Sequence, residues 1–218
     1  MSYYSLTENN KINRNLLQTL KTGDLLLFHY NGSGCFGWFT NAIQYFTNSR
    51  WSHVAMVLKD PSFLDKQLKG LYIWESSWSG KPDPQDGKIK LGVQITPIDE
   101  VFNEYTNHGD IYVRKIICNA KLFSDYNLKK VHKVVYDKPY DIVPKDWIQA
   151  IFRKDSDPKK TSRFWCSALV GYIYNKCGII EKKTDWSVLR PADFAIGSET
   201  IDFVGYAHLD NTQYKLLG

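Results

Sequence analysis

Cys166 is the residue in this sequence with the best setting for nucleophilic chemistry. A cysteine attacks carbonyl groups as the thiolate, which the first turn of a helix stabilises through unpaired N–H groups and the helix dipole. Cys166 follows a charged segment at 153–163 and opens the run WCSALVGYIYNKC, whose apolar residues have helical spacing. Cys177 ends the same run, where the dipole opposes ionisation. The pattern predicts a nucleophile at Cys166.

A thiol nucleophile needs an imidazole as base, and His53 is the strongest candidate. In a papain-like site the histidine is a neighbour of the cysteine in the fold, not in the sequence. His53 lies inside the strand pattern WSHVAMVL, where an imidazole among apolar residues requires a polar partner. The other histidines end a strand or fall in or near polar segments: His29, His108, His132 and His208.

A third polar group usually orients the imidazole, and Glu75 is the candidate for that role. Glu75 lies in the apolar strand pattern LYIWESS, where a carboxylate is costly to bury without a partner. Tyr140 and Asp141, in KPYDIV, are candidates for a phenol near the oxyanion and for a structural or orienting carboxylate.

Each candidate also has a structural interpretation. A free cysteine is commonly a core residue, and a core histidine can be satisfied by its surroundings. Glu75 could pair with a surface lysine, and a residue such as Tyr140 is more often a packing residue. A zinc site would need paired spacings such as C-x-x-C or H-E-x-x-H, which this sequence lacks. The glycines at 32, 34 and 37 have the G-x-G-x-x-G spacing of a nucleotide-binding loop, but they lie outside any clear βαβ unit. We therefore expect neither a metal nor another cofactor.

The elements that must position these residues follow from hydrophobic periodicity and turn signals. Residues 1–21 form an N-terminal arm with a short helix at 13–20, and residues 22–218 form a single domain. The expected strands are 25–29, 51–59, 71–76, 93–96, 111–117 and 201–206. The expected helices are 36–47, 98–105, 127–136, 147–152 and 164–177. Together they predict an α+β domain, an antiparallel sheet of about five strands with helices packed on one side.

Composition narrows the class of protein. The chain has 218 residues, 43% of them hydrophobic, which suits one globular domain. The formal net charge of +5 is dispersed along the chain, without the basic stripe and interleaved aromatics of a nucleic-acid-binding protein. Four cysteines without C-x-x-C spacing indicate reduced thiols. With neither a signal peptide nor a transmembrane segment in sight, we expect an intracellular (cytoplasmic) or virion-associated protein.

The order of the motifs resembles one known family. GDLLLF, WSHVAMVL, the glutamate strand IWES, a Tyr-Asp pair and WCSALV follow one another over roughly residues 22–195. This series resembles the circularly permuted branch of the NlpC-type papain-like superfamily, which includes the YiiX-like group, poxvirus relatives and, more distantly, the lecithin:retinol acyltransferase group. In that branch the histidine strand precedes the cysteine helix.

The resemblance implies a permuted papain-like fold with a catalytic cysteine, Cys166, at a helix N-terminus, His53 as base and Glu75 as third member. It implies a thiol hydrolase that cleaves amides, esters or thioesters of peptide, lipid or acylated substrates through an acyl-enzyme, without a cofactor. Two alternatives stay open. One is a lipid-directed acyltransferase or phospholipase with a peripheral membrane contact, suggested by Phe36-Gly-Trp-Phe39 and the positive charge. The other is a catalytically inactive binding or virion structural module.

Overall fold

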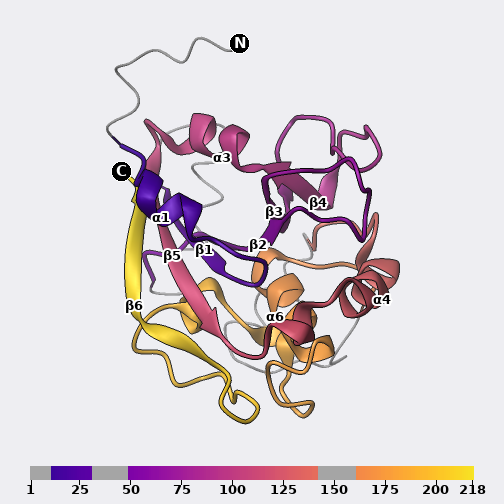
Figure 1. The fold of residues 1–218 in the computed structure, drawn as a ribbon, viewed down its shortest axis with the longest axis vertical. Coiled ribbons are helices and arrows are strands. Elements are labelled where there is room, and N and C mark those ends of the chain that lie inside the picture. The colour runs from indigo at the N-terminus through magenta and orange to yellow at the C-terminus, as the bar shows by residue number, and fades with distance from the viewer. Residues whose placement is uncertain (1–10, 31–48, 142–160) are drawn as a thin grey trace.

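A six-stranded antiparallel sheet forms the centre of the fold, with strand order β4-β3-β2-β1-β5-β6 (Figure 1). The computed structural model describes residues 11–30, 49–141 and 161–218. The strands are β1 Leu25–Tyr30, β2 His53–Lys59, β3 Leu71–Trp78, β4 Leu91–Pro97, β5 Gly109–Ile117 and β6 His208–Leu217. The α-helices of this part are α1 Arg14–Gln18, α3 Ile98–Tyr105, α4 Asp125–Val135 and α6 Cys166–Lys176, and short 3-10 helices cover Ala120–Phe123, Trp186–Val188 and Pro191–Phe194. The α+β class is confirmed.

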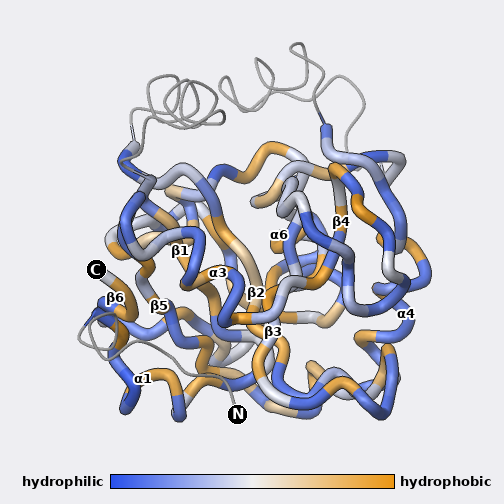
Figure 2. Tube along the Cα trace, turned by 90° about the horizontal axis from the view of Figure 1, so that it is seen from above, coloured by the Kyte–Doolittle hydropathy of each residue, from blue (hydrophilic) through white to orange (hydrophobic). Residues whose placement is uncertain are grey.

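Side chains that alternate along the central strands supply two hydrophobic cores. Leu25 and Leu27 of β1 belong to the core that contains the buried residues of α4 and α6. Leu26 and Phe28 belong to a second core, formed with α1 and α3. Successive side chains of a strand point to opposite faces, so strands this apolar must be covered on both sides. Figure 2 shows the apolar segments of the central strands in the middle of the fold.

The expectation that helices pack on one side of the sheet is therefore wrong. The amphipathic helix α3 places Ile98, Val101, Phe102 and Tyr105 against the face opposite α6. Figure 1 shows α3 and α6 on opposite sides of the sheet. The strand at 51–59 is apolar at both its odd and its even positions, and that pattern requires two covered faces.

The last strand was expected at 201–206, and this prediction is also wrong. That segment forms only an isolated bridge, between Phe203 and Ile180. The final strand is β6, which pairs with β5 at the edge of the sheet and is interrupted by register shifts. Most of its middle residues, DNTQYK, are exposed or half-buried, so β6 lacks the apolar run by which central strands are recognised. Its pairing with β5 decides its conformation.

Helix α6 is almost completely enclosed by the rest of the domain. Its residues Cys166 to Asn175 are all buried. The helix begins after Trp165, which has extended backbone angles, and Gly178 beyond its other end has a φ of +75°. A glycine with positive φ just past the last turn is a common helix stop. The segment before α6 is extended, so Cys166 occupies the first helical position.

Some predicted features lie outside the described residues. These are the helices at 36–47 and 147–152, the glycines at 32, 34 and 37, Cys35 and the aromatic stretch Phe36–Phe39. Among the helices of the described ranges, none combines the length and the apolar character that crossing a membrane would need.

One buried hydrogen bond joins α6 to the start of the sheet. The hydroxyl of Tyr174 donates to the carbonyl of Gly23 at 2.6 Å. Tyr174→Phe removes this donor from a buried carbonyl, so we expect the free energy of unfolding to fall by about 1–3 kcal/mol. Urea titration measures the change. The matched control Tyr206→Phe, at a side chain that is 66% exposed, should leave the midpoint unchanged. Equal stability of Tyr174→Phe and wild type would contradict the assignment.

Candidate active site

The side chains of Cys166, His53 and Glu75 form one connected chain of hydrogen bonds. The thiol of Cys166 is hydrogen-bonded to His53. His53 Nε2 lies 2.8 Å from Oε2 of Glu75. Because Nε2 is engaged by the carboxylate, Nδ1 is the ring nitrogen left for the thiol. Cys166 and Glu75 are 3% and 6% exposed, so the chain is largely withdrawn from water.

The cysteine enters an opening between two strands. The paired register of β2 with β3 covers Met56 to Lys59, and its continuation would place Val54 opposite Ser76. Instead the N–H of Val54 donates to the sulfur of Cys166, and the hydroxyl of Ser76 donates to the carbonyl of Phe164 at 2.6 Å. The segment that leads into α6 thus fills the place where the two strands diverge.

The surroundings of Cys166 favour the thiolate. Burial alone would raise the pKa of this thiol, but the imidazolium of His53 and hydrogen bonds from His53 and the N–H groups of Val54 and Ser167 lower it below its ordinary value. Burial likewise opposes a charge on His53, yet Cys166 and Glu75 raise the pKa of His53 to about 10. Both shifts favour a thiolate–imidazolium pair at neutral pH.

The other described cysteines have the opposite character. Burial and the neighbouring Cys118 raise the pKa of Cys177 to about 12. Burial also raises the pKa of Cys118. Thiols of this kind are inert at neutral pH. Among the described cysteines, activation is therefore specific to Cys166.

Glu75 is held by a residue that the sequence analysis missed. The hydroxyl of Thr96, on β4, donates to Oε1 of Glu75 at 2.5 Å, while Oε2 faces His53. Both carboxylate oxygens therefore have a partner. Thr96 is 5% exposed, and a buried polar residue in an apolar strand was the same signal that identified Glu75.

Tyr140 lies beside the thiol. Its hydroxyl is hydrogen-bonded to Cys166, and burial together with the nearby thiolate raises the pKa of Tyr140 well above its ordinary value. The phenol is therefore protonated at neutral pH and donates to the sulfur. Its backbone N–H donates to the carbonyl of Leu91 at 3.1 Å, and a parallel bridge joins it to Phe164. These contacts hold Tyr140 between β4 and the start of α6.

Asp141 is buried next to this phenol and forms an ion pair with Arg163, with Oδ1 3.8 Å from NH1. Its backbone N–H donates to the carbonyl of Phe164 at 3.2 Å. Asp141 thus anchors the segment that precedes Cys166, and its predicted orienting role stays a prediction.

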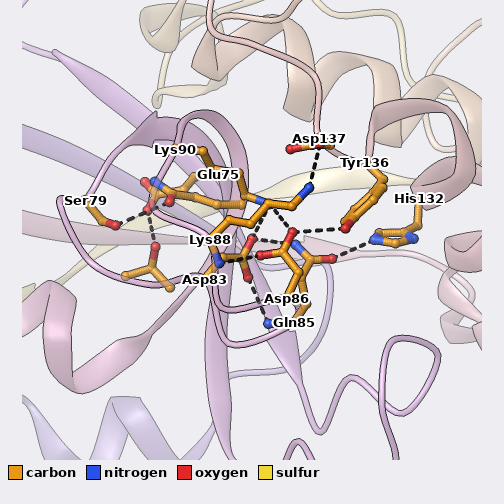
Figure 3. Close-up of polar contacts among 12 residues, drawn as sticks. Glu75, Ser79, Asp83, Gln85, Asp86, Lys88, Lys90, His132, Tyr136 and Asp137 are labelled. Atoms are coloured by element: carbon orange, nitrogen blue, oxygen red, sulfur yellow. Dashed lines mark hydrogen bonds and ion pairs between the residues drawn. The ribbon is translucent and has the colours of Figure 1, made fainter.

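An ion-pair network fastens the connection between β3 and β4 to α4 (Figure 3). The ammonium of Lys90 lies 2.9 Å from carboxylate oxygens of both Asp83 and Asp86. Asp86 accepts a hydrogen bond from the hydroxyl of Tyr136 at 3.0 Å, and Gln85 contacts His132 at 2.7 Å. The connection between β3 and β4 is thus tied to the end of α4, directly before the segment that carries Tyr140.

The remaining histidines have contacts elsewhere. His29 lies 3.7 Å from Asp110, His108 stacks on Tyr30, His132 contacts Gln85, and His208 contacts the carbonyl of Tyr206. Across the described ranges there is no group of three or more His, Cys, Asp or Glu residues arranged to hold a metal ion.

Comparison of the chain with protein-family models finds no match, and comparison with curated proteins finds none either.

The thiolate–imidazolium pair predicts an unusual pH profile for alkylation. Iodoacetamide should modify Cys166 at pH values well below about 8.5, the usual pKa of a free cysteine thiol, because His53 stabilises the thiolate. In His53→Ala the profile should move to that value or above it. Site-resolved mass spectrometry measures the rates, with Cys118 and Cys177 as slow internal references and His208→Ala as control. Coincident profiles for wild type and His53→Ala would refute the pairing.

Thr96→Val removes the hydrogen bond that orients Glu75. We expect alkylation of Cys166 at pH 7 to slow about tenfold, because a hydrogen bond to a charged group contributes roughly 1.5 kcal/mol. Thr96→Ser keeps the hydroxyl and should retain most of the rate. If the valine and serine variants react equally fast, Thr96 serves packing alone.

Proposed function

We propose that this chain is a thiol hydrolase of the permuted papain-like class, with Cys166 as nucleophile, His53 as base and Glu75 as the residue that orients the imidazole. The observation that carries the proposal is the connected hydrogen bonding from Cys166 through His53 to Glu75. A structural cysteine has no need of such a chain, whereas a nucleophile requires a base and a base requires orientation.

In the proposed reaction the thiolate of Cys166 attacks the carbonyl carbon of the substrate. The charge that develops on the carbonyl oxygen is stabilised by N–H groups at the start of α6 and by the hydroxyl of Tyr140, which is released from the sulfur as the new bond forms. The imidazolium of His53 then protonates the leaving amine, alcohol or thiol, and Cys166 is left as a thioester.

The second half of the reaction returns the enzyme to its starting state. Neutral His53 removes a proton from water or another acceptor, which attacks the thioester and releases the acyl group. The carboxylate of Glu75 keeps Nε2 protonated, so that Nδ1 faces the reacting atoms in both steps. The proposed substrates are amides, esters or thioesters of peptide, lipid or acylated molecules.

The arrangement of the elements also supports the permuted class. The histidine lies on β2 and the cysteine on α6, so the base precedes the nucleophile along the chain. The helix that begins with Cys166 packs on the antiparallel sheet whose central strand carries His53. This order and packing match what the sequence resemblance implies for the fold.

The test is capture of the acyl-enzyme. Mixed with p-nitrophenyl acetate, the wild-type protein should release a burst of p-nitrophenol and gain one acetyl group at Cys166, seen by peptide mass spectrometry. Cys166→Ala should abolish the burst, and His53→Ala should slow it by on the order of 10² or more, the usual contribution of a general base. Cys118→Ala serves as the matched control and should behave as wild type. Acetylation spread evenly over other residues, or no burst at all, would sink the hydrolase proposal.

A further inference from the structure

The backbone carbonyl of Leu189 accepts two side-chain hydrogen bonds, one from each of the residues that flank Cys166 in the sequence. The hydroxyl of Ser167 donates to this carbonyl at 2.6 Å, and the indole N–H of Trp165 donates to it at 3.3 Å. A carbonyl oxygen has two lone pairs, so two donors use its full capacity. The proposed nucleophile therefore lies between two residues that are tied to one point of the chain.

Both bonds reach outside the helix that begins at Cys166. A serine in a helix ordinarily bonds to backbone groups within four residues of itself, whereas 22 positions separate Ser167 from Leu189. Trp165 is the residue before α6, and its side chain makes no capping bond to the helix. The two side chains thus join the start of α6 to a segment that follows the helix in the sequence.

The segment that supplies this carbonyl packs closely against α6. The 3-10 helix Trp186–Val188 lies directly before Leu189, and the ring of Trp186 stacks on that of Phe164 with centroids 5.6 Å apart. At Gly171 the two elements approach so closely that a Cβ atom would lie 2.7 Å from Cδ1 of Leu189 and 3.0 Å from Cβ of Trp186. Close packing of this kind leaves the carbonyl little freedom to move relative to the helix.

The sulfur of Cys166 has its own partners on another element. It is hydrogen-bonded to His53 and to the N–H of Val54, both near the start of β2. A small rotation of the first turn of α6 would lengthen both of these bonds. The strength of a hydrogen bond depends steeply on its distance and angle, so the stability of the thiolate depends on how firmly this turn is held.

We propose that Ser167 and Trp165 are positioning residues that act through one group, the carbonyl of Leu189. By holding the backbone on both sides of Cys166, they keep its sulfur directed at His53. The inference rests on the proposed function in one respect, that Cys166 is the nucleophile. Its test measures the thiolate itself and needs no substrate.

Ser167→Ala removes the shorter of the two bonds, and the pH profile of Cys166 alkylation by iodoacetamide measures the consequence. Because the first turn of α6 is then held less firmly, the contact with His53 weakens and the profile should move to higher pH. The rate at pH 7 should fall about fivefold, the order of effect of one hydrogen bond. Trp165→Phe keeps an aromatic ring, removes the longer bond and should shift the profile in the same direction by a smaller amount.

The matched control is Tyr174→Phe, which removes another hydroxyl-to-carbonyl bond of 2.6 Å from the same helix. Urea titration should show comparable losses of stability in Ser167→Ala and Tyr174→Phe, while only Ser167→Ala changes the pH profile. A profile of Ser167→Ala that coincides with that of the wild type overturns the inference, and so does an equal shift in Tyr174→Phe. If Ser167→Ala does not fold, Trp165→Phe decides by the same comparison.

The wild-type profile separates this inference from the proposed function. If the wild type has the low-pH profile of an activated thiol and Ser167→Ala keeps it, the positioning role fails and the hydrolase proposal stands. If Cys166 of the wild type titrates like an ordinary thiol, with a midpoint near about 8.5, no activated pair exists. The positioning role and the hydrolase proposal then fail together.

Discussion

The contact between Cys166 and His53 is the interaction on which the arrangement of this domain depends. A buried thiolate and a buried imidazolium are costly unless each is paired and hydrogen-bonded. The pairing of β2 with β3 stops at Met56, and the start of α6 lies where the two strands diverge. There the sulfur of Cys166 accepts a hydrogen bond from the N–H of Val54. The divergence of the two strands therefore fixes the position of α6 and also supplies a hydrogen bond that favours the thiolate.

The polar groups around this pair come from nearly every neighbouring element. β3 supplies Glu75, β4 supplies Thr96, and the segment after α4 supplies Tyr140. The network of Asp83, Asp86 and Lys90 joins the β3–β4 connection to the end of α4. This contact holds the segment after α4, which carries Tyr140, in place. Since the members of the site come from different elements, its geometry is a property of the whole domain.

The predictions of the fold were right where local pattern and burial agree. Helix α3 has the predicted bounds, Ile98–Tyr105, because its amphipathic spacing matches the face it buries. The central strands are right because long apolar runs admit few other structures. The failures were the edge strand β6 and the second covered face of the sheet. An edge strand is stabilised by pairing with its neighbour, and the placement of helices depends on long-range packing, neither of which local pattern contains.

By itself the sequence determined which residues could do chemistry: a cysteine that opens an apolar helix, and a histidine and a glutamate within apolar strands, each costly to bury alone. The tertiary structure decided that Cys166, His53 and Glu75 meet and that Thr96 holds the carboxylate. The reason is physical. The type of a residue and the apolar pattern around it can be read from the nearby sequence. Which residues become neighbours across a sheet follows from strand register and from the divergence of β2 and β3, and only the folded chain specifies these.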